Sequence, residues 1–367
     1  MVEKMVDKKN KNFFRKKINS KISFYLVFFL FFISAELIII NYILPKEEHP
    51  LEEYNIFYNK NICDFKNKLT GLCVNAEEEE NIWPVALMID NNPDSWPQFG
   101  LARADLVYST LVEGGATRFL AFFTNSSVAK IGPIRSARPY YLTWAKEMNA
   151  LYGHSGGSIE AIQKIAEYKV LNLEEATSYG PNYFWRDNMG GYYAPHNLFT
   201  SSSRLQKARE DFELLNKKLE YSGWFFNTNA KLGNEIADKI TINYSPGVLF
   251  DVSYEFNTST VSYLRFQNKA PQIDGLDNSQ IAVKNIIIQF VPREKHLDVE
   301  DRLYINTIGE GKAHIFYSGH KLEARWKKQD VVSRTKFYTL DGEDVIFIPG
   351  NVWVEVVPGN REVMISN

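Results

Sequence analysis

The stretch LYGHSGGSIEAIQKI, residues 151–165, carries the pattern of a strand, a glycine turn and a helix. The apolar run LYGH precedes Gly156 and Gly157, and apolar residues then recur at helical spacing. Ser158 stands where a helix N-cap is expected, since its hydroxyl can accept a hydrogen bond from an amide of the first turn. Because strand-like and helix-like runs alternate in this way through about residue 235, we predict a layered α/β domain.

The same stretch also matches the G-x-S-x-G pattern of a hydrolase nucleophile elbow, with Ser155 in the serine position. In that interpretation, a sharp turn from strand to helix exposes the Ser155 hydroxyl for attack on a carbonyl. The alternative is a glycine-rich turn that carries no chemistry. The stretch alone does not choose between these two interpretations.

The chain after about residue 240 is typical of short strands separated by Asn, Asp-Gly and Pro-Gly turn signals. The segment LDGED, residues 340–344, lies between two β-like runs and predicts a hairpin. We therefore expect two domains after the N-terminal region. They are an α/β domain over residues 83–238 and a β-rich domain over residues 239–367.

The N-terminal region consists of a basic tail and a long apolar run. Residues 1–21 contain eight Lys/Arg and two Asp/Glu. Residues 22–44 would span about 34 Å as a helix, enough to cross a hydrocarbon core of about 30 Å. Since Lys/Arg accumulate on the cytoplasmic side of such helices, we predict a single-pass signal-anchor with the N-terminus in the cytoplasm. The alternative is a cleavable signal peptide that ends at Ser34-Ala35.

Residues 45–82 are expected to form an extracytoplasmic linker, because they contain a run of glutamates and little periodicity. Cys63 and Cys73 both lie in this segment. An oxidising compartment favours a disulfide between them over two free thiols in a flexible stalk. In the loop-entropy model such a short loop stabilises the fold by about 2–3 kcal/mol.

The near-neutral chain hides an asymmetric distribution of charge. Beyond residue 21 it carries 34 Lys/Arg against 42 Asp/Glu, a net charge of −8. An acidic body does not suit a phosphate backbone, so nucleic acid is not an expected partner.

Several charged side chains stand at the ends of predicted strands or in turns, where functional groups of α/β proteins often lie. Arg135 and Arg138, just before Pro139, could direct two guanidiniums to one carboxylate or phosphate. The alternative is internal ion pairing with Glu113 or Asp105. We predict a polar ligand-binding cleft with these lining residues: Asp90, Glu113, Arg118, Arg135, Arg138, His154 and His196.

Two of these residues are also candidates for catalysis. His196 lies in the polar loop WRDNMGGYYAPHNLFTS, residues 185–201, and a histidine titrates near neutrality. Together with Glu113 it could provide an acid and a base, although a lone histidine is more often structural. No third ligand accompanies His154 and His196 at a spacing suited to zinc, so we predict neither a metal nor a cofactor.

A series of motifs runs in order along residues 69–358. The motifs are LTGL, PVALMIDN, GLARADLVYSTLVEGGATRFLAFF, GPIRSARPYY, HSGGS and APHNLFTS, followed by NIIIQF, ARWKK, DGEDVIFIPG and VWVEVVP. With these motifs the chain resembles the YerB-like lipoproteins, a bacterial family of unknown function (DUF3048). The resemblance implies an extracytoplasmic, membrane-attached protein with an α/β N-terminal and a β-rich C-terminal domain. It implies no established activity.

The chain departs from the family's pattern in three places. Many relatives carry a lipid-modified cysteine where this chain has the apolar run of residues 22–44. The family commonly has a proline where this chain has Cys73 after LTGL. It usually has His-Ala-Gly-Gly-Ser where this chain has HSGGS, residues 154–158. Because an alanine cannot attack a carbonyl, the resemblance implies that Ser155 is not a nucleophile.

We therefore expect a membrane-anchored, extracytoplasmic cell-envelope protein that binds a polar or anionic ligand, for which cell-wall glycans and peptides are the nearest source. Two alternatives stay open. The first is a hydrolase or transferase that acts on cell-wall polymers with Glu113 and His196 as its acid and base. The second is an interaction module that recruits another envelope protein through the β domain. The sequence does not determine whether the protein is an enzyme.

Overall fold

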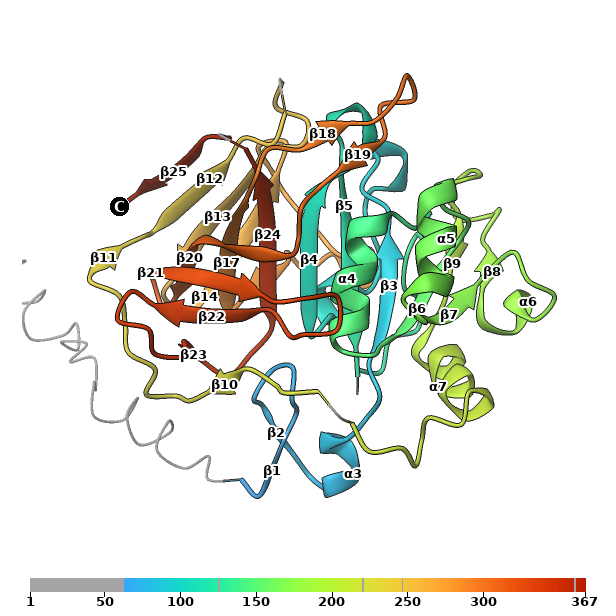
Figure 1. Cartoon of the computed structure of the whole chain (residues 1–367), viewed down its shortest axis with the longest axis horizontal. Helices are drawn as coiled ribbons and strands as arrows, with labels where there is room; N and C mark the ends of the chain where they lie inside the picture. Colours follow the sequence, from blue (N-terminus) through green and yellow to red (C-terminus); the bar gives the residue numbers. More distant parts are fainter. Residues whose placement is uncertain (1–62, 125, 220, 246, 360) are drawn as a thin grey trace, which may run out of the picture. The chain divides into compact units, whose positions relative to one another are not determined.

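The computed structural model describes residues 63–124, 126–219, 221–245, 247–359 and 361–367. The basic tail, the anchor predicted over residues 22–44 and the first part of the linker lie outside the described residues. Within the described part of the chain, no helix combines the length and the apolar character needed to cross a membrane. The described residues from 63 to 367 form one unit with a mixed α/β fold in which strands predominate (Figure 1).

The centre of the fold is an eleven-stranded sheet. The runs LVYSTL and TRFLAFF form two of its strands, and every residue of both is buried, as expected for strands covered on both faces. In order across the sheet, the strands are β11 (Glu235–Ile236), β21 (His320–Lys328), β20 (Gly309–Tyr317), β17 (Asn285–Val291), β24 (Val352–Pro358), β4 (Leu106–Leu111), β5 (Thr117–Phe123), β3 (Val85–Ile89), β6 (Leu151–His154) and β7 (Leu171–Glu174), and β22 (Lys336–Thr339) pairs with β21.

The sheet continues through both of the domains that the sequence predicts. Strand β24, near the C-terminus, pairs in parallel with β17 on one side and with β4 on the other. At this seam Val354 lies opposite Tyr108, and the Thr110 hydroxyl donates to the Val356 carbonyl at 2.8 Å. The two halves of the chain therefore share one hydrogen-bonded sheet. The boundary predicted near residue 239 falls between β11 and the first strand of a second sheet.

The second sheet has six strands and packs on one face of the first. Its buried Arg265 lies over the rings of Phe119 and Trp353, at 5.3 and 4.7 Å from the ring centroids. The strands are β15 (Ala270–Pro271), β14 (Ser262–Gln267), β13 (Val252–Asn257), β12 (Lys239–Ile242) and β25 (Val363–Ser366), with β16 (Ala282–Val283) on β14. The two-stranded sheets are β1 (Phe65–Lys66) with β2 (Cys73–Val74), β8 (Trp185–Arg186) with β9 (Leu198–Phe199), β10 (Phe225–Phe226) with β23 (Ile346–Phe347), and β18 (Lys295–His296) with β19 (Leu303–Tyr304).

Two helices, α4 (Pro139–Glu147) and α5 (Ile159–Glu167), cover the opposite face over the N-terminal strands (Figure 1). Trp144 of α4 stacks on Tyr108 with ring centroids 4.7 Å apart. Ser158 caps α5 by accepting from the Ala161 amide, as the sequence predicts. The remaining helices and 3₁₀ turns are α3 (Glu77–Glu80), α6 (Gly180–Tyr183), α7 (Ser202–Asp211), η1 (Pro93–Ser95), η2 (Leu101–Arg103) and η3 (Glu113–Gly115).

The described part of the predicted linker packs on this body. Leu69 is buried, and the Asn67 side-chain amide donates to the Thr124 hydroxyl at 2.7 Å. Cys63 and Cys73 are joined by a disulfide with their Cα atoms 5.8 Å apart. The buried side chain of Leu69 and the hydrogen bond from Asn67 thus attach this segment to the folded body, although its composition resembles that of a solvated stalk.

Candidate functional site

The strand ends predicted to carry the site do lie at one edge of the sheet. Asp90 directly follows β3, and Arg118 occupies the next position of the antiparallel register in β5. The Arg135 amide donates to the Met88 carbonyl at 2.9 Å, which holds the segment before α4 against the end of β3. Three segments that are separate in the sequence therefore bring their charged side chains together.

Asp90 is the buried centre of one part of the site, with 3 % of its surface exposed. Its Oδ2 lies 2.6 Å from His196 Nδ1 and 3.0 Å from Arg135 Nε. The second contact is an ion pair without hydrogen-bond alignment, because Arg135 Nε has no hydrogen-bond partner among the described residues. Asp90 therefore orients the His196 ring and leaves an Arg135 donor unused.

Glu113 and Arg138 form a second pair. Arg138 donates from Nε to Glu113 Oε1 at 2.6 Å and from Nη2 to Oε2 at 2.9 Å, the bidentate geometry that arginine favours with carboxylates. Burial alone would raise the pKa of the Glu113 carboxyl, but the hydrogen bonds and charge of Arg138 outweigh it and lower that pKa. Glu113 is therefore held as a carboxylate.

Arg118 lies between these two pairs and is bound by neither. Only 6 % of the residue is exposed, and its Nη1 donates to the Ser136 carbonyl at 2.8 Å. Its Nε has no hydrogen-bond partner, and none of the described carboxylates lies within ion-pair distance. Burial lowers the pKa of the Arg118 guanidinium and the charge of Arg138 adds to this, while Asp90 opposes it. We call Asp90, Glu113, Arg118, Arg135 and Arg138 the Arg118 cluster.

Tyr152 of β6 adds one more unused donor near this cluster. Its ring is fully buried, and its hydroxyl has no hydrogen-bond partner among the described residues. Burial raises the pKa of the Tyr152 hydroxyl well above the ordinary tyrosine value, and the nearby charges of Arg118 and Arg138 oppose this. The hydroxyl therefore stays protonated and can act as a neutral donor.

His154, the last of the predicted cleft residues to be placed, has hydrogen-bond partners outside the Arg118 cluster. Its Nε2 lies 2.7 Å from Asn172 Oδ1, and its Nδ1 lies 3.0 Å from Glu174 Oε2. The residue is fully buried, and its ring contacts that of Tyr152 at a centroid distance of 5.0 Å. The hydroxyl of Ser155 donates to Glu175 at 2.9 Å and not to the histidine. The structure thus gives His154 a satisfied environment beside the Arg118 cluster.

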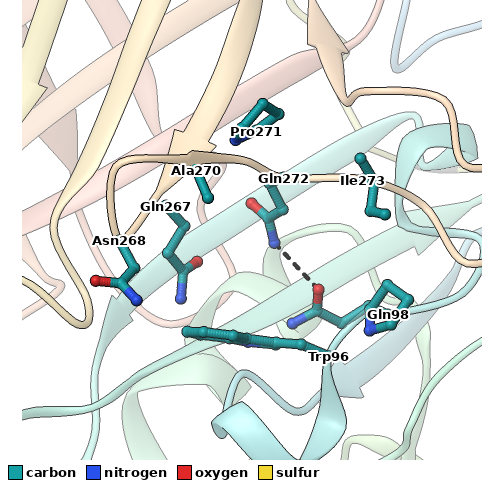
Figure 2. Close-up of a pocket in the computed structure, with 9 residues that line it drawn as sticks. Trp96, Gln98, Gln267, Asn268, Ala270, Pro271, Gln272 and Ile273 are labelled. Atoms are coloured by element: carbon teal, nitrogen blue, oxygen red, sulfur yellow. Dashed lines mark hydrogen bonds between the residues drawn. The ribbon is translucent and has the colours of Figure 1, made fainter.

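A second group of polar residues, which the sequence does not single out, surrounds Trp96. Figure 2 shows the pocket that they form, of about 360 Å³. Trp96 and Gln98 come from the loop after β3, while Gln267 and Gln272 come from β14 and the segment after β15. The only local signal is a tryptophan beside prolines in NNPDSWPQFG, residues 91–100. Gln267 and Gln272 lie far from Trp96 in the sequence, and neither belongs to a motif that indicates a binding site.

A further pocket, of about 590 Å³, has the same tryptophan among its lining residues. His196, Asp94 and Tyr193 line it together with Trp96. His196 Nε2 faces the exposed Asp94 carboxylate at 4.0 Å. The predicted His196 therefore does reach a pocket, next to residues that the prediction did not include.

The described side chains offer little to a metal ion. Among them, no three His, Cys, Asp or Glu residues converge closely enough to hold one. The unused donors of the Arg118 cluster and of Tyr152 beside it are guanidinium and hydroxyl groups, which suit an anion and not a cation.

Comparison with known proteins identifies the family of this chain. The model for "Protein of unknown function (DUF3048) N-terminal domain" matches residues 69–214, and the model for the DUF3048 C-terminal domain matches residues 240–354. YerB of Bacillus subtilis (strain 168), named as a proposed lipoprotein, is 30% identical over 303 residues, which cover 82% of this chain and 88% of YerB. The crystal structure of the YerB protein from Bacillus subtilis superposes with a TM-score of 0.70 at 27% identity, over 82% of this chain and 99% of that one. The chain therefore belongs to the YerB-like DUF3048 family, as the motifs predict.

Proposed function

We propose that the protein is a membrane-attached, extracytoplasmic component of the cell envelope that binds an anionic ligand at the Arg118 cluster. Two observations support the location. The relative YerB is named as a proposed lipoprotein, and this chain has the apolar run of residues 22–44 behind a basic tail. The envelope supplies carboxylate-bearing peptides and phosphorylated glycans to such a protein.

The location predicts which part of the chain a protease can reach. In intact cells stripped of their wall, residues 62–367 should be degraded by added protease, while an epitope placed before residue 22 should survive. Degradation of the epitope and survival of the body would reverse the proposed topology.

The single observation that carries the ligand proposal is the state of Arg118. Buried charges in proteins are normally paired, because a low-dielectric environment penalises an isolated ion. Arg118 is buried and has only a backbone carbonyl as its partner among the described residues. An anionic ligand would supply the missing charge.

The neighbouring groups fit the same ligand. Unused donors remain on Arg118 Nε, Arg135 Nε and the Tyr152 hydroxyl. Guanidinium groups bind planar carboxylate and phosphate oxygens through charge-assisted hydrogen bonds. Because Glu113 and Asp90 already hold Arg138 and Arg135, the cluster is preorganised and a ligand need not order these side chains.

The test is a titration of the full chain in a mild detergent with muropeptides and with phosphorylated glycans, followed by calorimetry. A charged hydrogen bond stabilises by about 1.5–3 kcal/mol, so Arg118→Met should weaken binding by about 10- to 100-fold. Arg103→Met is the matched control, because Arg103 is an exposed ion-pair partner of Asp277. Equal affinity in the wild type and Arg118→Met would refute the proposal.

A second candidate function is acid–base catalysis on cell-wall polymers, and the Asp90–His196 pair favours it. A buried carboxylate fixes His196 Nδ1 at 2.6 Å, and the ring lines an open pocket. This arrangement suits a general base oriented by a carboxylate. Glu113 is less suited to proton transfer, because Arg138 lowers its pKa and occupies both of its oxygens.

Catalysis predicts a product. Purified peptidoglycan incubated with the full chain should release soluble fragments, and His196→Gln should abolish the release while the circular dichroism spectrum stays unchanged. Absence of product over a range of pH and of added divalent metals would leave binding as the function.

A further inference from the structure

We propose that the pocket over Trp96 is a subsite for a neutral hexopyranose ring of an envelope glycan. The proposal rests on the proposed function for the source of the ligand. It uses different residues from the Arg118 cluster, so the two can fail separately.

The Trp96 indole is a fixed platform. Its Nε1 donates to Asn91 Oδ1 at 2.9 Å, which holds one edge of the ring. The residue is half-buried and lines two pockets. In Figure 2 the ring lies flat along one side of the pocket, with Gln267 and Gln272 beyond its face. One face of a rigid aromatic ring is thus presented to the cavity.

The amides around the platform are oriented by a buried arginine. Arg265 can only donate hydrogen bonds, and it donates to the side-chain oxygens of both Gln267 and Gln272. Both glutamines must therefore turn their NH₂ groups away from Arg265. Arg265 is itself fixed by an ion pair with Glu355, in which both side chains are fully buried.

Each of these NH₂ groups has one hydrogen left for a ligand. The Gln267 amide uses one hydrogen on Asn91 Oδ1 at 3.2 Å, and the Gln272 amide uses one on Gln98 Oε1 at 3.1 Å. An NH₂ group has two donors. Asn268 lies at the pocket edge, and its side chain makes no hydrogen bond to any residue that the structure describes. The pocket therefore offers neutral donors and an acceptor around an apolar face.

This combination fits a pyranose ring. A hexopyranose has an apolar C–H face that packs on an indole and hydroxyls at its rim that bond to amides. None of the nine described side chains lining the pocket is ionisable, so nothing in it selects an anion. The volume of about 360 Å³ lies within the range of small-molecule sites, roughly 300–1,000 Å³.

The second pocket, which shares Trp96 with the first, extends the subsite. Trp96 lines both pockets, and the second contains Tyr193, which is 79% exposed. An exposed aromatic ring at this position could stack on a second sugar. A chain of at least two sugars could therefore pass over the tryptophan toward His196.

The experiment uses chitotriose as a neutral N-acetylated probe and maltotriose as a probe without acetamido groups, titrated by calorimetry into the full chain in a mild detergent. We expect at least one trisaccharide to bind, with about tenfold or greater weakening in Trp96→Ala. Tyr304→Ala is the matched control, because Tyr304 is an exposed aromatic residue that lines neither pocket. Unchanged affinity in Trp96→Ala would overturn the proposal, and so would failure of both trisaccharides to bind.

A second variant tests the pocket in case Trp96→Ala fails to fold. Asn268 has a φ of +51°, so Asn268→Gly removes the amide at a position where glycine is favoured. We expect a several-fold weaker affinity with unchanged circular dichroism. Binding of adenosine that competes with the trisaccharide and is equally lost in Trp96→Ala would show that the pocket takes a nucleobase, which would also overturn the proposal.

The two sites are separated by exchanging variants and probes. Arg118→Met should leave trisaccharide binding unchanged while it weakens binding of the phosphorylated glycan. Loss of trisaccharide binding in Arg118→Met would contradict an independent neutral subsite. Loss of the anion site with trisaccharide binding intact would leave the inference standing without the proposed anion function.

Discussion

Two clusters of buried charge lie on different parts of this fold, and they differ in whether each buried cation contacts a carboxylate. In the first, Glu147 accepts from Lys328 at 2.8 Å and from the Thr335 hydroxyl at 2.7 Å, and it also binds Arg334. We call these four residues the Glu147 cluster. In the Arg118 cluster, the side chain of the central arginine has only a backbone carbonyl as its hydrogen-bond partner among the described residues. Each cluster contains one more cation than carboxylates, so the excess of charge alone does not distinguish them.

The difference is in the pairing. Both cations of the Glu147 cluster contact the same carboxylate, and the three charged side chains are at most 5% exposed. This cluster also connects α4 to the C-terminal half of the chain, so it stabilises the joined fold. Arg118 is buried without such a contact. A buried charge that the protein leaves unpaired indicates a ligand site more specifically than a buried charge that it pairs.

The largest expected effect is on Glu147. Glu147→Ala leaves Lys328 and Arg334 buried and unpaired, which should lower the free energy of unfolding by about 3–5 kcal/mol. Urea denaturation of the full chain, followed by circular dichroism, measures this. Glu255→Ala is the control, because Glu255 forms an exposed ion pair with Lys239 and should cost at most about 1 kcal/mol. Equal losses in the two variants would show that the Glu147 cluster contributes no more to stability than an exposed ion pair.

A smaller effect concerns His314, a buried group that avoids unpaired charge by staying neutral. Both of its ring nitrogens lack hydrogen-bond partners among the described residues. Burial, followed by the charges of Lys312 and Lys321, lowers the pKa of His314 from 6.5 to about 4. Below pH 6.5 His314 therefore binds a proton in the unfolded chain but stays neutral in the folded chain until the pH approaches 4. The free energy of unfolding therefore falls as the pH falls.

The pH effect of His314 is measured between pH 7 and pH 5. Burial raises the pKa of the Asp105 carboxyl to about 6, so Asp105 titrates in the same interval, but it does so in both proteins and its contribution cancels in the comparison. The wild type should lose about 1–2 kcal/mol more stability over this interval than His314→Phe. The phenylalanine is accommodated because the rings of Phe290 and Phe316 already surround the site. Parallel pH profiles of the two proteins would mean that His314 is protonated in the folded state.

The smallest expected effect on stability is that of Arg118. Methionine replaces the aliphatic stem of arginine and carries no charge to desolvate, so Arg118→Met should change the free energy of unfolding by about 1 kcal/mol or less. The same variant should lose most of its affinity for the anionic probes. A destabilisation of about 3 kcal/mol or more would place Arg118 with Glu147 as a structural residue.

Much of the local structure could be predicted from the sequence. The runs that became β3, β4 and β5 are continuous and apolar, and α5 follows its predicted Ser158 cap. These features depend on residues that are close together in the chain. Apolar runs, hydrophobic periodicity and capping residues therefore indicate them directly. The family assignment is confirmed for the same reason, since it rests on ordered local motifs. The predicted anchor and its topology stay a prediction.

The predicted binding cleft stays a prediction. The register of β3 and β5 brings Asp90 and Arg118 to neighbouring strand ends, and the alternative of a Glu113–Arg138 ion pair is observed. The sequence could not show that Arg118 would have no carboxylate, because that depends on which side chains the fold leaves out of reach. The pocket over Trp96 was not predicted, because no local sequence pattern connects Trp96 with Gln267 and Gln272.

The sequence by itself determined the long apolar strands, the main helices, the cap of α5 and the family, since each follows from residues adjacent in the chain. The tertiary structure alone decided that β24 joins β4, and that one sheet therefore runs through both halves. It alone decided which buried cations are paired and which amides surround Trp96. Hydrogen bonding between distant strands and burial of charge are properties of the packed molecule, and local sequence specifies neither.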